Sequence, residues 1–203
     1  MPYVREIEPD QATGRLKEIY QDMLVEWGGR IPAVLQVLSL RPETLDSVRK
    51  QNRVIAFGGS TLGRRWEEMI ATVVSSRNGC YYCMHSHGEF LRAATRDDAL
   101  VYHMQHDYTQ ADLSDQDRAM LEFVVKLNDQ PKTVTEADVQ TLRDAGFDDE
   151  GVVDVVMVCS LYNFMNRLAD GLGPIVNPAF VKSKERRDQR IGPQQAAAQP
   201  KAT

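Results

Sequence analysis

Apolar side chains recur at intervals of three and four residues along most of the chain, a spacing typical of helices that bury one face. Glycine and proline residues separate these stretches, and no segment has the pattern of a strand. The chain is therefore predicted to be all-α. The expected helices cover approximately residues 11–27, 32–40, 43–57, 64–77, 80–94, 98–106, 115–127, 136–146 and 150–171.

The helix expected over residues 150–171 differs from the others because it is apolar almost all round. Such a helix is predicted to lie buried in the core. We expect a single domain over residues 1–182. Within it, residues 1–60 are expected to form a helical extension that packs on the core or on a neighbouring subunit, and residues 61–182 to form the core itself.

The C-terminal end of the chain has a different composition. After Pro178 it turns to Lys, Arg, Gln, Ala and Pro, with few apolar residues to bury. Such a segment cannot offset the entropy that ordering costs. We therefore expect a tail over residues 183–203 that is disordered from about Ile191.

Composition limits the possible classes of function. With 203 residues, of which 42% are hydrophobic and 26% charged, the chain is long enough for one domain with a sizeable core. A net charge of -5 and an isoelectric point near 5.4 argue against nucleic acid or an anionic membrane surface as the main partner. No stretch approaches the roughly 18 consecutive apolar residues of a membrane span, and the N-terminus lacks the apolar core of a signal peptide. We therefore expect a cytoplasmic protein.

Two of the three cysteines and two of the four histidines lie between Cys80 and His87. Gly79 is expected to end the preceding helix, so that Cys80 opens a new one. At about 100° per residue, Cys80, Cys83 and His87 then fall within about 60° of one another. His85 falls on the other side of the helix, at about 140°, and we interpret it as a surface residue.

This arrangement favours thiol chemistry. A thiol at a helix N-terminus lies near unpaired amide donors and the positive end of the helix dipole, which favour its thiolate. His87, one turn after Cys83, can take up the thiol proton, and a second cysteine three residues away can trap a sulfenic acid as a disulfide. Two alternatives stay open. One is a zinc site, for which two thiolates and an imidazole would need a fourth ligand; the other is a pair of buried, small apolar side chains.

A longer pattern includes these residues: a glutamate, eleven residues, Cys-x-x-Cys, three residues and a histidine, here Glu68, Cys80, Cys83 and His87. It resembles the signature of the alkylhydroperoxidase D-like branch of the carboxymuconolactone decarboxylase family. The N-terminal extension and the segment from Asn166 to Gly173 are similar to one group of that family, the uncharacterised peroxidase-related proteins, and the resemblance covers roughly residues 30–180. Helical periodicity does not distinguish Glu67 from Glu68; only the family spacing selects Glu68.

The resemblance implies a thiol-dependent hydroperoxide reductase that requires no haem, flavin or metal cofactor. Cys83 would attack the peroxide, Cys80 would resolve the sulfenic acid to a disulfide, and Glu68 would draw the proton from Cys83 through His87 or an ordered water. The implied partners are a hydroperoxide, an external dithiol of lipoyl or thioredoxin type, and further copies of the chain in a trimer or hexamer. The chain departs from the family at Tyr82, where the best-studied members place a histidine between the two cysteines.

Three further side chains are candidates for the pocket. Tyr82 is expected to pack beside the thiols. Asn163 and Arg167 interrupt the apolar helix, and because buried polar groups need partners, they either line the pocket or fix helix packing. The alternatives to a peroxidase are a general disulfide oxidoreductase or redox sensor, a zinc-stabilised module without enzymatic activity, and a lactone enzyme of the carboxymuconolactone decarboxylase type, whose members lack the cysteine pair.

Overall fold

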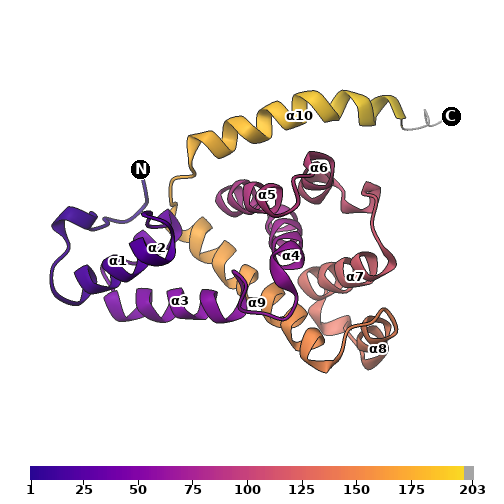
Figure 1. The fold of residues 1–203 in the computed structure, drawn as a ribbon, viewed down its shortest axis with the longest axis horizontal. Helices are drawn as coiled ribbons and strands as arrows, with labels where there is room; N and C mark the ends of the chain where they lie inside the picture. The colour runs from indigo at the N-terminus through magenta and orange to yellow at the C-terminus, as the bar shows by residue number, and fades with distance from the viewer. Residues whose placement is uncertain (199–203) are drawn as a thin grey trace.

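The computed structural model describes residues 1–198, in which helices are joined by turns and short loops and no strand is present (Figure 1). The prediction of an all-α fold is confirmed. The α-helices are α1 (Gly14–Glu26), α2 (Ala33–Gln36), α3 (Pro42–Ile55), α4 (Gly63–Arg77), α5 (Tyr81–Thr95), α6 (Asp98–His106), α7 (Asp115–Asp129), α8 (Glu136–Asp144), α9 (Asp149–Leu172) and α10 (Pro178–Ala198). Short 3₁₀ helices cover Pro9–Gln11, Tyr108–Gln110 and Pro131–Thr133.

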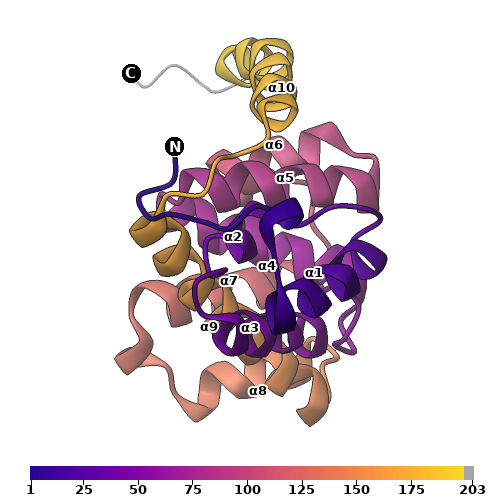
Figure 2. The same ribbon diagram turned by 90° about the vertical axis from the view of Figure 1, so that its left-hand side faces the viewer.

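Helix α4 lies at the centre of the molecule, in contact with α5, α6, α7 and α9 (Figures 1 and 2). Every side chain from Glu67 to Ser75 is buried, on all sides of the helix. Small residues on this helix, such as Ala71 and Thr72, leave room for the neighbouring helices. Two glutamates, Glu67 and Glu68, are therefore held in the interior, where each needs partners.

Helix α9 is the apolar helix expected over residues 150–171. By length and composition alone it could cross a membrane, but half of its most apolar window is buried inside the protein. It packs against α4 and α7 on one side and against α3 on another. Burial in the core thus accounts for much of its apolar character.

The N-terminal extension packs on α9 of the same chain through α3. Arg49 of α3 is buried and pairs with Asp46 of the same helix at 2.6 Å and with Glu26 of α1 at 3.0 Å, which joins α1 to α3. Helix α2 is shorter than the sequence predicts. It ends at Gln36, and turns continue to Arg41.

Helix α10 contradicts the expected disordered tail. Residues 183–198 belong to this helix, which lies across α5 and α6 (Figures 1 and 2); the remaining residues, 199–203, lie outside the described range. Arg187 is 3% exposed and donates to Glu89 Oε1 at 3.1 Å and to Gln105 Oε1 at 2.9 Å. The sequence pattern missed the helix because its buried face is anchored by an arginine rather than by a row of apolar residues.

The same packing corrects the interpretation of His85. It points away from the sulfurs, as predicted, but it is buried rather than on the surface, because α10 covers that side of α5. Its Nδ1 atom lies 2.8 Å from the Tyr81 carbonyl oxygen, and its ring packs on the Tyr81 ring. Burial lowers the pKa of His85, so at neutral pH it serves as an uncharged packing residue.

Asp117 joins α7 to α4 and gives a first prediction. Its carboxylate accepts from both Arg65 guanidinium nitrogens, at 2.6 and 2.8 Å, and from Trp66 Nε1 at 2.6 Å. These bonds overcome burial and lower the pKa of Asp117 to about 2. Relative to an ordinary aspartate, this shift corresponds to about 2 kcal/mol of stability at neutral pH. Asp117→Asn is expected to lower the free energy of unfolding at pH 7 by that amount, measured by urea denaturation.

The pH dependence tests the cause. A carboxyl group with a lowered folded-state pKa stabilises the protein fully above its unfolded pKa and loses that contribution as the pH falls through its folded pKa. The difference in the free energy of unfolding between wild type and Asp117→Asn should therefore shrink as the pH falls from 4 to 2. Asp115→Asn, which removes an exposed charge from the same helix turn, is the matched control. If this free-energy difference stayed constant over the range, the lowered pKa of Asp117 would not be the cause of the stabilisation.

Candidate active site

The site is built on the hairpin formed by α4 and α5. Gly79 adopts φ 69°, and its N–H bonds to the Ser76 carbonyl while the N–H of Cys80 bonds to the Ser75 carbonyl. This is the geometry with which glycine ends a helix. Cys80 becomes the N-cap of α5, as predicted, and α5 runs back along α4. The hairpin brings His87 of α5 against Glu68 of α4.

Glu68 and His87 form a buried pair. Glu68 Oε2 lies 2.7 Å from His87 Nδ1, and Glu68 Oε1 accepts from the Arg64 guanidinium. Glu68 is 0% exposed and His87 is 7% exposed. Because Glu68 engages Nδ1, Nε2 is the ring nitrogen left for other chemistry. A carboxylate in this position fixes the orientation and tautomer of a histidine.

The neighbouring glutamate has a different role. Glu67 accepts from the Gly58 N–H at 2.8 Å and from Ser60 Oγ at 2.7 Å, and it pairs with Arg64 at 3.0 Å. It therefore holds the loop between α3 and α4. Of the two glutamates that periodicity could not distinguish, the structure brings Glu68 and not Glu67 to His87.

The cysteine pair lies at the N-terminus of α5. All three cysteines are free thiols; Cys80 is 0% and Cys83 2% exposed, and Ala169, Val34 and Tyr82 pack around the pair. Cys80 Sγ also lies 3.9 Å from the Asn166 carbonyl oxygen. A hydrogen bond with Cys83, and then burial, raise the pKa of the Cys80 thiol. Cys80 is thus held in its protonated form, although its place at the helix terminus alone would favour its thiolate.

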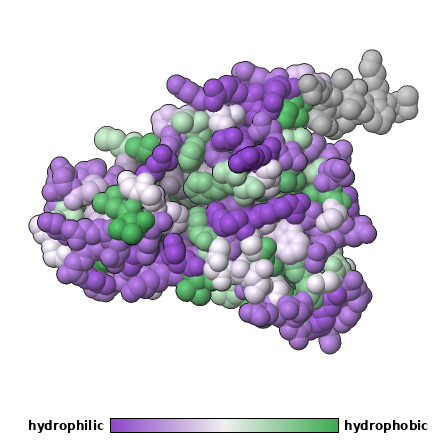
Figure 3. Space-filling view, in the orientation of Figure 1, coloured by the Kyte–Doolittle hydropathy of each residue, from purple (hydrophilic) through white to green (hydrophobic). Residues whose placement is uncertain are grey.

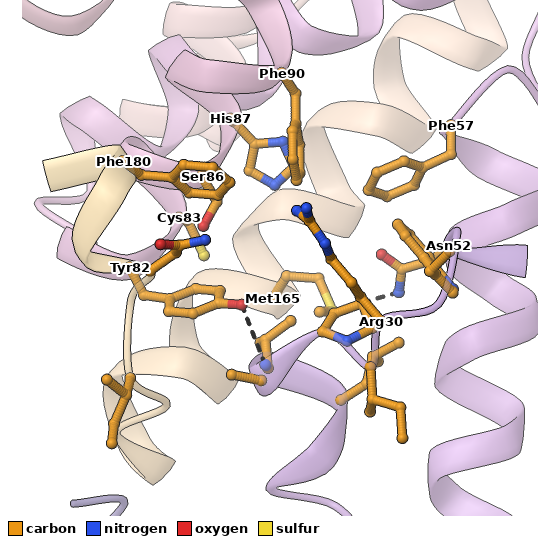
Figure 4. Close-up of a pocket in the computed structure, with 18 of the residues that line it drawn as sticks. Arg30, Asn52, Phe57, Tyr82, Cys83, Ser86, His87, Phe90, Met165 and Phe180 are labelled. Atoms are coloured by element: carbon orange, nitrogen blue, oxygen red, sulfur yellow. Dashed lines mark hydrogen bonds between the residues drawn. The ribbon is translucent and has the colours of Figure 1, made fainter. Parts of the chain in front are cut away.

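A cavity of about 320 Å³ opens beside Cys83 (Figure 4). From the core it is lined chiefly by Tyr82, Cys83, Ser86, His87, Phe90 and Tyr162. From the N-terminal extension it is lined chiefly by Trp27, Arg30, Pro32, Val34, Asn52 and Phe57. Cys80 is not part of the lining. A small molecule in this cavity would meet Cys83 first, with His87 beside it and Cys80 behind.

Figure 3 places this site in its surroundings. The face toward the viewer is mostly hydrophilic, and apolar side chains gather in the hollow between the N-terminal helices and the body of the molecule. Phe57, Phe90 and Tyr162 surround the His87 ring, with ring centroids at 6.3, 5.5 and 4.5 Å. The His87 ring is therefore packed among aromatic side chains and is only 7% exposed.

The three candidate pocket residues fall in different places. Tyr82 lines the cavity, where its hydroxyl accepts from the Val34 N–H at 3.3 Å and burial raises its pKa to about 12. Asn163 and Arg167 lie outside the lining. Asn163 donates to Asn128 Oδ1 at 2.8 Å, and Arg167 donates to Asn163 Oδ1 at 2.9 Å. Of the two roles left open for this pair, the structure supports helix packing.

Several lining residues were not predicted from the sequence. Trp27, Arg30, Phe57 and Tyr162 come from segments with no local motif, and only the fold brings them to Cys83. One feature of the backbone marks Phe57, which adopts φ 56° although it is not glycine. An aromatic residue in this conformation is costly and is often found at functional sites.

The zinc alternative finds little support in the donor set. In the part of the chain that the structure describes, no three His, Cys, Asp or Glu side chains are grouped to hold a metal ion. His87 Nδ1 is engaged by Glu68. The nearby cysteines therefore lack the further ligands that a structural zinc site uses.

Several solved structures are similar to this chain in fold. The chain matches the AhpD-core structure of an uncharacterised peroxidase-related protein from Ralstonia eutropha JMP134, with a TM-score of 0.80 and 26% identity over 88% of this chain and 94% of that one. It matches a peroxidase-related protein from Silicibacter sp. TM1040 with a TM-score of 0.78 and 28% identity over 88% and 97%. The debrominase Bmp8, at 16% identity and a TM-score of 0.75, shares the fold.

Sequence comparison adds one more relative. The uncharacterised protein YdfG of Bacillus subtilis strain 168 is 28% identical over 116 residues, which are 56% of this chain and 78% of YdfG. No protein-family model matches the chain. The assignment therefore rests on the solved structures, whose shared fold extends over nearly the whole chain. This fold and these identities support the assignment of the chain to the alkylhydroperoxidase D-like branch of the carboxymuconolactone decarboxylase family.

Proposed function

We propose that this protein is a thiol-dependent hydroperoxide reductase in which Cys83 attacks the peroxide and Cys80 resolves the product. One observation carries the proposal. Cys83 and His87 line the same apolar cavity, His87 is oriented by Glu68, and Cys80 is buried directly behind. Nucleophile, base and resolving thiol are thus present together, which is what two-cysteine peroxide chemistry requires.

The first half of the reaction oxidises Cys83. His87 Nε2 takes the thiol proton, and the positive charge that develops on the ring is stabilised by Glu68 at 2.7 Å from Nδ1. The Cys83 thiolate attacks the terminal peroxide oxygen, the O–O bond breaks, and its electron pair leaves on the alkoxide. His87 returns the proton to that alkoxide. The products are a Cys83 sulfenic acid and an alcohol, or water when the substrate is hydrogen peroxide.

The second half forms the disulfide. The Cys80 sulfur attacks the sulfenic sulfur of Cys83, an S–S bond replaces the S–O bond, and the departing hydroxide takes the Cys80 proton and leaves as water. Cys80 is the N-cap, with extended backbone angles of φ -73° and ψ 102°, so it lies outside the regular helix and can adjust. Two electrons from an external dithiol then restore the two thiols.

The burial of the Cys80 and Cys83 sulfurs limits which oxidants and reductants can reach them. A small peroxide can enter the cavity, whereas a folded protein disulfide cannot reach sulfurs that are 0% and 2% exposed without a rearrangement. This supports a peroxidase over a general disulfide oxidoreductase. For the same reason we propose that the reductant is a slender dithiol of the lipoyl type rather than one fixed on a flat protein surface.

Assembly into a homo-oligomer also belongs to the proposal. Val153, Met157 and Phe164 are 59%, 39% and 46% exposed on α9. Their spacing places them on one side of the helix. An apolar stripe of this kind supports a contact between copies of the chain.

The test is stopped-flow oxidation of the reduced protein by hydrogen peroxide and by cumene hydroperoxide, with thiol counting and mass spectrometry of the product. The urea-unfolded chain supplies the rate of the same thiols without the site. We expect the folded protein to be oxidised much faster than the unfolded chain. It should lose two of its three thiols and contain a Cys80–Cys83 disulfide. Oxidation no faster than in the unfolded chain would overturn the proposal.

A further inference from the structure

Asn166 of α9 joins that helix to the end of α4, just before Cys80. The residue is 1% exposed. Its side-chain nitrogen donates to Ser75 Oγ at 3.0 Å, and its side-chain oxygen accepts from Asn78 Nδ2 at 2.9 Å. Ser75 lies in the last turn of α4, and Asn78 is the C-cap. One buried amide therefore fixes both residues against α9.

The end of α4 in turn holds Cys80. The Cys80 N–H donates to the Ser75 carbonyl at 2.9 Å. The main-chain carbonyl of Asn166 lies 3.9 Å from Cys80 Sγ, within reach of a weak thiol donor. Ala169, three residues further along the same side of α9, packs against both cysteines. Cys80 is thus held through its backbone by Ser75 and at its sulfur by α9.

Other amides extend this network away from the thiols. Asn163 donates to Asn128 Oδ1 at 2.8 Å, and Asn128 donates to Asn78 Oδ1 at 3.1 Å. Neither contacts Ser75 or the Cys80 sulfur through any hydrogen bond within residues 1–198. Asn166 is therefore the asparagine of the network that reaches Cys80. An amide of this length is needed because it both donates to Ser75 and accepts from Asn78.

We propose that Asn166 is a positioning residue for the resolving thiol. Cys80 is the N-cap of α5, outside the regular helix. Any freedom of its backbone is lost each time the disulfide forms, at a cost in entropy. By holding the turn beforehand, Asn166 reduces that cost and keeps the Cys80 sulfur close to Cys83. This proposal rests on the proposed function, in which Cys80 attacks the Cys83 sulfenic acid and water leaves.

The equilibrium between thiols and disulfide tests this role without any peroxide. In buffers of reduced and oxidised glutathione, the two protein thiols give two electrons and two protons to glutathione disulfide, which becomes two glutathione thiols. The Cys80–Cys83 disulfide forms in exchange. Asn166→Leu fills a similar space without polar groups. It is expected to shift this equilibrium about tenfold toward the protein thiols, or about 30 mV in reduction potential. An unchanged equilibrium would overturn the positioning role, as would the absence of this disulfide from wild type at every glutathione ratio.

Two more variants separate positioning from a loss of stability. Ser75→Ala removes only the hydroxyl that Asn166 binds, so it tests the proposal even if Asn166→Leu does not fold. It should shift the equilibrium in the same direction by about threefold, as expected for the loss of one hydrogen bond. Asn163→Ala is the matched control, because it loosens the same helix without touching Ser75 or Cys80. An equal shift in Asn163→Ala would overturn the positioning role.

Kinetics then separate this role from the peroxidase function. After mixing with hydrogen peroxide, Asn166→Leu should oxidise Cys83 at a rate near that of wild type. Disulfide formation should then be about tenfold slower, with the sulfenic acid trapped by dimedone. Equal slowing of both steps would mean that Asn166 supports the whole site and would overturn the proposal. If the glutathione equilibrium shifts as expected but peroxide does not oxidise wild type, the peroxidase function fails while the positioning of Cys80 stands.

Discussion

Cys83→Ser is expected to slow oxidation of the reduced protein by hydrogen peroxide by roughly a thousandfold or more, because a serine hydroxyl is almost never ionised at neutral pH and is a poor nucleophile toward peroxide. The remaining thiols cannot replace it. Cys80 is fully buried behind Cys83, and its pKa is raised. The measurement is the second-order rate constant by stopped-flow, read from intrinsic fluorescence and from thiol counts.

Cys80→Ser should give a different result. Cys83 is still present, so the first oxidation is expected to proceed at a rate near that of wild type, but the sulfenic acid has no resolving partner. It should accumulate and be trapped by dimedone, with a mass change at Cys83. Cys159→Ala is the matched control, because this third thiol is buried in α9, near the Val124 carbonyl and away from the cavity. If Cys83→Ser reacted normally and Cys80→Ser did not, the two roles would be reversed.

Glu68→Gln is expected to lower the rate of Cys83 oxidation by about a hundredfold, within the range that a general base contributes. The substitution keeps the shape of the side chain but removes the charge that stabilises protonated His87. The rate should therefore recover as the pH rises and the thiol ionises without help, so that the pH–rate profile moves to higher pH. This shift separates a role in proton transfer from a general loss of structure.

Glu67→Gln is the control for this variant, since the two glutamates are adjacent and both are 0% exposed. Glu67 holds the loop at Gly58 and Ser60, so its replacement is expected to lower stability by roughly 1–3 kcal/mol. Oxidation by hydrogen peroxide, which needs little of the cavity, should proceed unchanged. If Glu67→Gln lost more of the oxidation rate than Glu68→Gln, the assignment of the proton relay to Glu68 would be wrong.

Local patterns in the sequence were enough to predict the helix that carries the cysteine pair. Gly79 ended α4 because its conformation suits a helix terminus, and helical spacing then brought Cys80, Cys83 and His87 to one face. Glu68 could not be chosen by periodicity, since Glu67 is buried as well. Only the family spacing selected it, and the structure explains why: the antiparallel hairpin sets which residue of α4 meets His87.

The features that the sequence did not predict depend on contacts between distant segments. The prediction that His85 lies on the surface was wrong because α10, nearly a hundred residues later, covers it. The disordered tail expected over residues 183–203 was wrong as far as residue 198 for the complementary reason, since helix α10 gains its partners only when α5 and α6 are in place. Arg30 and Tyr162 carry no motif, and nothing local indicates that they share a cavity with Cys83.

The two walls of the cavity come from different stretches of the chain, and this separates chemistry from selectivity. Cys80, Cys83, His87 and Glu68 all belong to the hairpin of α4 and α5, whereas about half of the residues that line the cavity belong to residues 27–57. Under the proposed function, exchanging that stretch between relatives would change substrate preference and leave the cysteine pair, His87 and Glu68 in place. Under the same proposal, one thiol-bearing hairpin could accept different peroxides through changes in the segment that precedes it.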